Sequence, residues 1–266
     1  MKVKIEKIGF VIPCYKRLEY AKKLVSSIRS KHNIEIIIVD DCSEDGTSEW
    51  AIDKGYTLIN HPIRMGVSKS CNDGIKKSLE MGVDYMIISN SDIILHKDCV
   101  DNLANEYEND MNSSAMPGPR TAIDGASYIM HTGKDISYIR LDTPGVIDII
   151  DSLPLPKREL GSSLWHFYII SKAIIEKIGY FDENFPAPMY FEDNDYMRRL
   201  NLARLKFYSI SNALAFHVYS PKYGGGEYNK INSDYYLQKW GGPFNAEKYR
   251  KAFNGNPPPN IKTWCI

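Results

Sequence analysis

The 266-residue sequence has few cysteines, and no two of them have metal-binding spacing. There are five, an odd number, and none forms a C-x-x-C pair. A disulfide framework or a structural zinc site needs paired cysteines at short, regular spacing. We therefore expect free thiols in a reducing compartment. The five are Cys14, Cys42, Cys71, Cys99 and Cys265.

An excess of charge of one sign is also missing. The 33 lysines and arginines equal the 33 aspartates and glutamates, so the formal net charge is zero. Domains that bind nucleic acid generally carry a basic excess. The composition therefore excludes generic nucleic-acid binding, although a local pocket could still hold an anionic ligand.

Long apolar runs are absent as well. No stretch approaches the roughly 20 apolar residues that cross a bilayer, and the first ten residues, MKVKIEKIGF, carry too much charge for a signal peptide. Hydrophobic content of 43% and charged content of 25% are ordinary for a globular protein with a sizeable core. We expect a soluble, cytoplasmic protein without a transmembrane segment, which would meet a membrane only through a lipid-attached substrate.

The first half of the chain alternates short apolar runs with segments of helical period. One helical face carries Leu18, Ala21 and Leu24, and another carries Cys71 and Ile75. Short continuous apolar strands separated by amphipathic helices predict βαβ units and a mostly parallel sheet covered on both faces. The predicted strands are residues 8–13, 35–41, 56–60 and 85–89.

The second half has a different texture, without internal repeats or low-complexity linkers. Residues 113–159 contain several prolines and glycines and show little periodicity, so we expect a long excursion with short strands. The predicted elements are strands at 126–133, 136–141 and 162–171, a short helix at 172–179, a turn at 180–188, a helix from 190 to 203, a strand pair within 205–220, and a tail of ordered aromatic loops.

Polar residues follow three of the predicted strands. They are Pro13-Cys14-Tyr15, Asp40-Asp41 and Asn90-Ser91-Asp92. In open parallel sheets, ligands bind at the carboxyl ends of the strands. The three polar strand ends therefore predict one shared cleft.

The first two strand ends carry groups suited to a nucleotide. Tyr15 and Arg17 precede a helix, where an aromatic face and a cation suit a base and phosphates, although a plain turn with solvated charges explains them too. Asp40 and Asp41 repel each other unless something donates to them, as a nucleobase N–H or a ribose hydroxyl would.

The next two motifs have both a structural and a functional interpretation. In residues 64–75, RMGVSKSCNDGI, Gly66 precedes a helix and Asn72 lies within it. Asn72 either faces solvent or holds the neighbouring strand-end loops through hydrogen bonds. Asp92 is either a turn residue or a ligand for a divalent cation, since Mg²⁺ typically binds one or two protein carboxylates together with phosphates and water.

Acidic residues also gather at 190–199, YFEDNDYMRR. Glu192, Asp193 and Asp195 fall in the first turn of the predicted helix, where the helix dipole favours them. A carboxylate at a partly apolar helix N-terminus is also well placed to act as a general base. His217 follows an apolar run and is either structural or, as a neutral imidazole, part of a metal shell.

The order of these motifs resembles family 2 glycosyltransferases of the GT-A fold over roughly residues 8–220. The segment GYFDENF, at 179–185, is followed closely by ED-x-D-x-x-x-R, which resembles the acceptor-side signature of rhamnosyl-, glucosyl- and N-acetylhexosaminyltransferases. The resemblance implies an α/β fold with a Rossmann-like, mostly parallel sheet flanked by helices and a smaller antiparallel region. It also implies a single domain over 1–266, with a nucleotide-sugar half at 1–112, an acceptor half at 113–220 and a tail at 221–266.

The resemblance assigns roles on the donor side. It places the nucleotide near Pro13, Tyr15 and Arg17, gives Asp41 with its neighbour Asp40 to the base, and lets Gly66 and Asn72 complete the base pocket.

The resemblance also assigns the metal and the catalytic residues. Asn90-Ser91-Asp92 matches the D-x-D metal motif, with Asp92 and His217 at the ion, while Asp193 matches the catalytic base and Glu192 lies beside it. Asn90 departs from the pattern, because Asp is expected there. Asn90 can still bind a ribose or sugar hydroxyl, but one negative charge is lost, so we expect Mn²⁺ or Mg²⁺ as cofactor at lower affinity.

The expected reaction transfers a hexose, with inversion, from a nucleoside-diphosphate sugar to a hydroxyl group. UDP or dTDP is favoured over GDP because Asp41 suits uracil or thymine. The acceptor would be a glycan or a lipid-linked or protein-linked sugar. Trp165 and Trp240, with His166 and Phe244, are candidates to stack on it. Simple core packing is the alternative for all four and is favoured for Trp165.

Two alternatives remain from the sequence. A nucleotidyltransferase that makes sugar nucleotides usually has a glycine-rich phosphate loop after the first strand, and residues 12–20, IPCYKRLEY, contain no glycine. An inactive carbohydrate-binding module is favoured by Asn90 but disfavoured by the intact Glu192-Asp193 pair.

Overall fold

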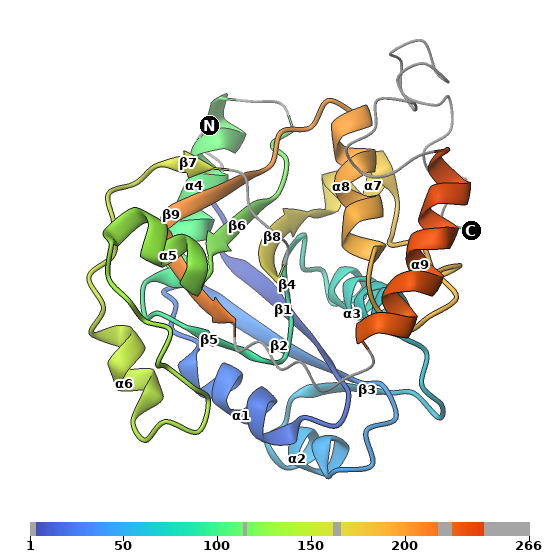
Figure 1. The fold of residues 1–266 in the computed structure, drawn as a ribbon, viewed down its shortest axis with the longest axis horizontal. Coiled ribbons are helices and arrows are strands. Elements are labelled where there is room, and N and C mark those ends of the chain that lie inside the picture. The colour runs from blue at the N-terminus through green and yellow to red at the C-terminus, as the bar shows by residue number, and fades with distance from the viewer. Residues whose placement is uncertain (1–3, 114–115, 162–165, 218–224, 242–266) are drawn as a thin grey trace.

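The computed structural model describes residues 4–113, 116–161, 166–217 and 225–241. Its centre is a nine-stranded sheet with the order β3-β2-β1-β4-β8-β6-β9-β5, and β7 pairs with β9 (Figure 1). The division of the chain into halves and a tail is not tested by this arrangement and stays a prediction. In the described part of the chain, no helix has the length and apolar composition to span a membrane.

The first four strands in this order are parallel, as the sequence predicts. They are β3 (Thr57–Asn60), β2 (Asn33–Asp40), β1 (Lys7–Cys14) and β4 (Tyr85–Ser89). β1 is buried along nearly its whole length, which agrees with a strand that is covered on both faces.

The remaining strands join the sheet mainly in the antiparallel sense. β8 (Phe167–Ser171) runs antiparallel to β4 and β6 (Arg120–Ile123), and β5 (Ile93–Leu95) runs antiparallel to β9 (Tyr208–His217). β7 (Leu160–Gly161) is also antiparallel to β9, whereas β6 and β9 are parallel. The predicted α/β fold with an antiparallel region is therefore confirmed.

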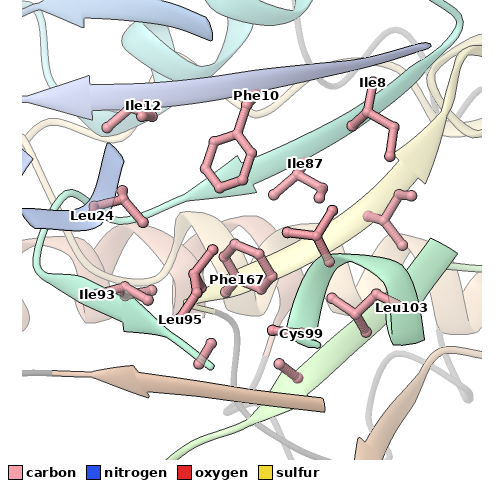
Figure 2. Packing of buried hydrophobic residues seen from close by; sticks show 14 of the residues in the cluster. Ile8, Phe10, Ile12, Leu24, Ile87, Ile93, Leu95, Cys99, Leu103 and Phe167 are labelled. Carbon is pink, nitrogen blue, oxygen red and sulfur yellow. The ribbon is translucent and has the colours of Figure 1, made fainter. Parts of the chain in front are cut away.

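Helices cover both faces of the sheet, and side chains alternate between the two cores. Phe10 and Ile12 of β1 point to the core that Figure 2 shows, where the ring centroids of Phe10 and Phe167 are 5.7 Å apart. Val11 points to the opposite core, with Ile75. The helices are α1 (Leu18–Ser27), α2 (Thr47–Asp53), α3 (Val67–Glu80), α4 (Cys99–Ser113), α5 (Gly125–Thr132), α6 (Val146–Asp151), α7 (Lys172–Ile178), α8 (Glu192–Leu202) and α9 (Gly225–Trp240).

Several predictions for the second half are wrong. The predicted strand at 126–133 is the helix α5, which begins where Asp124 accepts the Ser127 N–H and ends at Gly133, whose φ is 68°. Residues 136–141 form no strand. The predicted strand pair within 205–220 is the single strand β9, and the tail of loops contains the 16-residue helix α9.

The strand register brings the ends of β2, β4, β6, β8 and β9 to one edge of the sheet. β8 runs antiparallel to β4 and β6, and its first residue, Phe167, pairs with the last residue of β4, Ser89. Its amino end therefore lies beside the carboxyl ends of its neighbours. The residues that this edge carries, directly after or before the strands, are Asp41, Asn90, Asp124, His166 and His217.

The close packing of α3 on β1 depends on a glycine. A Cβ built on Gly74 would lie 2.2 Å from Cγ1 of Val11, which is fully buried. We expect Gly74→Ala to lower the free energy of unfolding by roughly 1–3 kcal/mol through overpacking, although alanine favours helices. Urea denaturation measures this change. The control is Gly226→Ala in α9, where a Cβ meets nothing within 4 Å, and we expect no loss there. Equal stability of Gly74→Ala and the original protein would contradict the packing argument.

Candidate active site

A cavity of about 790 Å³ opens at the edge of the sheet where the strand ends gather. Most of the residues that the sequence predicts for the site line it. They are Pro13, Tyr15, Arg17, Asp41, Asn90, Asp92, Glu192, Asp193 and His217.

Asp41 holds the loop that closes one end of the cavity. Its Oδ1 accepts the Met65 N–H at 2.6 Å and faces His61 Nδ1 at 2.8 Å, while its Oδ2 accepts the Gly66 N–H at 2.9 Å. The second ring nitrogen of His61 faces Asp73 at 3.1 Å. A carboxylate has about four acceptor positions, so three donors leave Asp41 able to accept one more hydrogen bond from a ligand.

Three other predicted donor-site residues lie behind the cavity lining. Asp40 accepts hydrogen bonds from Ser43 N and Ser48 Oγ, which shapes the turn after β2. Asn72 exchanges hydrogen bonds with the backbone of Phe181 and so joins α3 to the loop after α7. Gly66 has a φ of 89°, and a Cβ there would lie 3.0 Å from Pro188. These residues act on the cavity through the loops that they hold.

Asp92 is paired with a cation and an imidazole. Arg17 Nη1 donates to its Oδ2 at 2.7 Å, and His217 Nε2 lies 3.2 Å from its Oδ1. Burial alone would raise the pKa of Asp92, but His217 and Arg17 outweigh it and hold the pKa below the ordinary value. Asp92 is therefore an anion at neutral pH.

His166 lies beside this pair. Its ring stacks on that of His217, with centroids 4.0 Å apart. Burial, with the neighbouring His217 as a second cause, lowers the pKa of His166 to about 4. His166 is thus a neutral imidazole at the cavity wall.

The chemistry of Asp92 and His217 fits a divalent cation. Two ligands about 2.1 Å from one ion, at right angles, lie about 3 Å apart, close to the 3.2 Å between Asp92 Oδ1 and His217 Nε2. Among the described residues, no three His, Cys, Asp or Glu side chains form a group that could hold an ion. The protein therefore offers two ligands, and the remaining ones would come from substrate oxygens and water, as is usual for Mg²⁺.

Glu192 and Asp193 open α8 and also line the cavity. The two residues before them, Tyr190 and Phe191, have left-handed backbones with φ of 79° and 70°. This conformation costs about 1–2 kcal/mol for each residue other than glycine. Such local strain is typical of functional sites.

The two carboxyl groups lie in an environment that disfavours their charge. Asp193 Oδ1 accepts the N–H of Asn194, and Glu192 Oε2 is buried without a hydrogen-bond partner. Burial raises the pKa of Asp193. Burial, with the charge of Asp193 as the next cause, raises the pKa of Glu192 to about 8. At neutral pH the pair holds a shared proton more readily than two ordinary carboxylates would.

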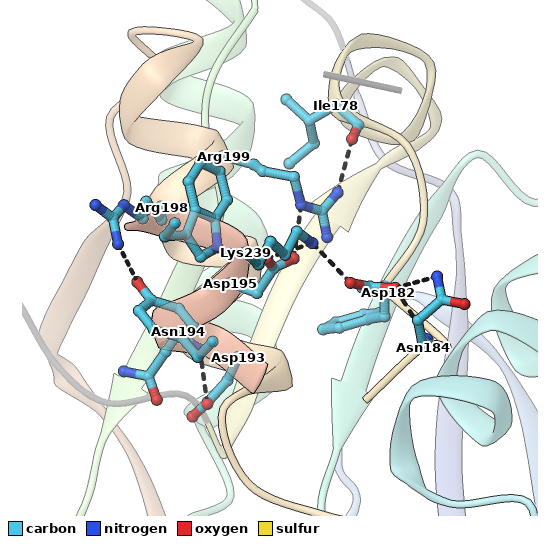
Figure 3. A network of polar contacts seen from close by, with 12 residues as sticks. Ile178, Asp182, Asn184, Asp193, Asn194, Asp195, Arg198, Arg199 and Lys239 are labelled. Atoms are coloured by element: carbon cyan, nitrogen blue, oxygen red, sulfur yellow. Dashed lines mark hydrogen bonds and ion pairs between the residues drawn. The ribbon is translucent and has the colours of Figure 1, made fainter. Parts of the chain in front are cut away.

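The third acid of this cluster has a structural role. Asp195 is fully buried and contacts Arg199 Nε at 2.9 Å, Lys239 Nζ at 2.7 Å and Trp240 Nε1 at 2.9 Å (Figure 3). Trp240, predicted to stack on an acceptor, is instead buried and donates to Asp195 away from the cavity, so this prediction is wrong. Trp165 lies outside the described residues.

Several residues that line the cavity were not predicted from the sequence. The guanidinium of Arg64 lies 3.9 Å from the ring centroid of Tyr15, and Asp124 caps α5 at the cavity edge. Arg64 stands in the glycine-containing motif, where a cation before the helix was a usable signal. Asp124 was hidden because the predicted strand at 126–133 removed the helix start that it caps.

The comparisons with known proteins identify the family of the chain. The sequence model of glycosyl transferase family 2 matches residues 10–160, more than half of the chain. The chain therefore belongs to glycosyl transferase family 2, and its α/β sheet is of the GT-A type.

Curated relatives are similar over parts of the chain. The poly-beta-1,6-N-acetyl-D-glucosamine synthase of Staphylococcus epidermidis is 23% identical over 185 residues, which cover 67% of this chain and 42% of the synthase. Abequosyltransferase RfbV of Salmonella typhimurium is 35% identical over 99 residues, which cover 34% of this chain and 29% of that enzyme. The chain thus spans less than half the length of these relatives.

Solved structures share the fold. S. aureus TarS 1-349 superimposes with a TM-score of 0.57 at 13% identity, covering 92% of this chain and 74% of that one. Its complex with UDP gives a TM-score of 0.53 at 15% identity, covering 93% and 75% of the two chains.

The raised pKa of Glu192 predicts how stability depends on pH. The unfolded chain ionises this carboxyl near pH 4.5, whereas the folded chain does so near pH 8. Its contribution to stability is therefore complete below pH 4.5 and is lost as the pH rises to 8. We expect Glu192→Gln to be more stable than the original protein by roughly 3–5 kcal/mol at pH 8, with a much smaller difference at pH 4.5.

Urea denaturation at both pH values measures this difference. The matched control is Glu176→Gln in α7, an exposed glutamate that should show no such pH-dependent gain. A Glu192→Gln protein that is no more stable than the original at pH 8 would contradict the assignment of a destabilised carboxylate.

Proposed function

We propose that the protein transfers a hexose from a nucleoside-diphosphate sugar to a hydroxyl group, with inversion at the anomeric carbon. The observation that carries this proposal is that a single cavity joins three kinds of site. Tyr15 and Asp41 lie at one end, Asp92 and His217 lie on its wall, and Asp193 faces it from α8. These three groups of side chains suit the base, the diphosphate and the reacting sugar of the donor, respectively.

UDP or dTDP is the proposed nucleotide. The remaining acceptor position of Asp41 suits the single N–H of a uracil or thymine edge, whereas guanine offers two N–H groups on the corresponding edge. Tyr15 and Arg64 supply an aromatic ring and a cation for the base and ribose phosphate. The structurally similar TarS was crystallised with UDP and with UDP-GlcNAc, which supports the same nucleotide here.

We assign Asp92 and His217 as the ligands of Mn²⁺ or Mg²⁺. When bound, such an ion neutralises the charge that develops on a leaving diphosphate. Arg17 holds Asp92 Oδ2 and so leaves Oδ1, on the His217 side, for the ion. Asn90, at the first position of the motif, lines the cavity and carries an amide in place of a carboxylate, which supports weaker metal binding than an Asp would give.

Asp193 is the proposed general base. The acceptor oxygen attacks the anomeric carbon while Asp193 removes its proton, and the bond from that carbon to the diphosphate oxygen breaks as the nucleoside diphosphate leaves. Attack from the face opposite the diphosphate inverts the configuration. The raised pKa makes Asp193 a stronger base than an exposed aspartate. Glu192, with a pKa of about 8, carries a proton at neutral pH and can donate a hydrogen bond to a sugar.

The proposed acceptor is a hydroxyl of a glycan or of a lipid-linked or protein-linked sugar. One relative is named as a synthase of an N-acetylglucosamine polymer and another as an abequosyltransferase, so sugar acceptors are consistent with the family. Because the chain spans less than half of these relatives, the acceptor rests on chemistry alone: the base needs a hydroxyl that can approach Asp193 through the cavity mouth.

The role of Asp193 is tested by Asp193→Asn. We expect the variant to fold and to bind UDP, but to transfer or hydrolyse UDP-N-acetylglucosamine roughly 10²–10⁴ times more slowly, because it cannot accept the proton. Release of UDP measures turnover. Asp142→Asn, which changes an exposed aspartate outside the cavity lining, is the control. Turnover by Asp193→Asn near that of the original protein would remove Asp193 from the base role.

The metal assignment is tested by Asp92→Ala. Calorimetric titration with UDP, in Mn²⁺ and in EDTA, should show a gain in affinity from Mn²⁺ in the original protein. In Asp92→Ala we expect the gain in UDP affinity from Mn²⁺ to be at least roughly 10- to 100-fold smaller. A loss of this size is typical when a residue that supports a metal ligand is removed. Asp98→Ala, an exposed aspartate nearby in the sequence, should keep the gain. Unchanged affinity of Asp92→Ala for UDP in Mn²⁺ would refute this role.

A further inference from the structure

One face of α9 packs against the segment that leads into α8 and carries Glu192 and Asp193. Asn232, Tyr236 and Trp240 are spaced by four residues and therefore lie on the same face of the helix. All three are buried, Asn232 and Tyr236 completely. Asn232 contacts the loop before α8, the ring of Tyr236 lies 5.5 Å from that of Phe191, and Trp240 reaches Asp195.

Asn232 makes an unusual number of contacts with a single loop. Its Oδ1 accepts the Ala187 N–H at 2.9 Å. Its Nδ2 lies 3.1 Å from the Ala187 oxygen, 2.7 Å from the Met189 oxygen and 2.9 Å from the Tyr190 oxygen. One fully buried amide therefore contacts four backbone groups of residues 187–190: its oxygen accepts one N–H, and its two N–H donors are shared among three carbonyl oxygens.

The contacts of Asn232 extend as far as Tyr190, the first of the two residues with a strained backbone. Tyr190 and Phe191 have left-handed φ values, and Glu192 and Asp193 follow them directly. A strained conformation persists only where its surroundings over-determine it. The hydrogen bond to the Tyr190 oxygen and the contact of Tyr236 with Phe191 fix the two strained residues from the α9 side.

The same helix also reaches the cavity and the far end of the loop. Asn229, one turn before Asn232, lines the cavity. Tyr235 and Lys239 donate to Asp182, at 3.0 and 2.7 Å, near the start of the loop. Helix α9 is thus connected to both ends of the segment that leads into α8.

We propose that Asn232 is a positioning residue for the transfer reaction: by clamping residues 187–190 to α9, it sets the orientation in which Asp193 meets the acceptor hydroxyl. This inference rests on the proposed function for its catalytic consequence, but not for the clamp itself. Binding of the nucleotide should depend little on Asn232, because Tyr15, Asp41 and Asp92 come from other elements.

The test compares Asn232→Ala with Ser233→Ala. Ser233 is the neighbouring, half-buried residue, and its hydroxyl donates only to the Lys230 oxygen of its own helix among the contacts described. Calorimetry with UDP and Mn²⁺ gives the number of binding sites per chain, so turnover of UDP-N-acetylglucosamine can be expressed per folded site. We expect Asn232→Ala to lose roughly 10- to 100-fold in kcat, as misplaced catalytic groups do, with KM and UDP affinity within about 2-fold.

A residue that only stabilised the fold would lower the number of sites and leave kcat per site unchanged, which would overturn the proposal. If Asn232→Ala melts below the assay temperature, Asn232→Asp replaces it, because aspartate has the same size but cannot donate to the Met189 and Tyr190 oxygens. The same loss of kcat per site is expected, and normal kcat per site in that variant would equally overturn the proposal.

A second measurement needs no substrate. Hydrogen exchange of the Ala187 amide should become at least roughly 10-fold faster in Asn232→Ala, which removes the acceptor of this N–H, while amides of the central strand β1 keep their protection. Unchanged exchange at Ala187 would refute the clamp. If the original protein binds UDP but turns over no sugar nucleotide, the proposed function fails while the clamp is still decided by the exchange measurement.

Discussion

The site depends on the pairing of β4 with a parallel neighbour on one side and an antiparallel neighbour on the other. β1 places the Tyr15–Arg17 loop beside the carboxyl end of β4, and β8 places His166 there through its amino end. β5, the short strand after Asp92, pairs with the end of β9 and brings His217 to Asp92. The change of strand direction at β4 therefore adds two histidines to the edge that carries the proposed nucleotide site.

The cavity keeps carboxyl groups in two opposite states. Asp92, with a guanidinium at 2.7 Å and an imidazole at 3.2 Å, stays ionised despite burial and suits a cation or the cationic partners of a diphosphate. Glu192 and Asp193 are half-buried next to each other, and no cation among the described residues forms an ion pair with either, so the loss of solvent raises their pKa values. The environment of each side chain, more than its residue type, thus decides which carboxyl group stays ionised and which ones accept a proton.

The sequence predicts the elements that local periodicity encodes. It does not predict the features that depend on contacts between segments far apart in the chain. The strands of the parallel half and the cluster of polar strand ends follow from apolar runs and their polar termini. The helix α5 was missed because Tyr128 and Ile129 suit a strand equally well, and only the cap by Asp124 and the end at Gly133 select the helix. Arg199, four residues after Asp195, is a local signal that distinguishes Asp195 from Asp193, whereas Lys239 and Trp240, its other partners, come more than 40 residues later.

The contact of Asp195 with Lys239 of α9 explains how the strained backbone of Tyr190 and Phe191 can persist. Asp195 forms an ion pair with Arg199 on its own helix and another with Lys239 of α9, and both acidic side chains that Lys239 contacts, Asp182 and Asp195, are completely buried. Buried pairs of this kind contribute little net stability but are costly to break. They therefore fix the position of α8 against α9 more than they add to the free energy of folding. With α8 held from behind, the loop before it can keep the left-handed turn that exposes Glu192 and Asp193 to the cavity.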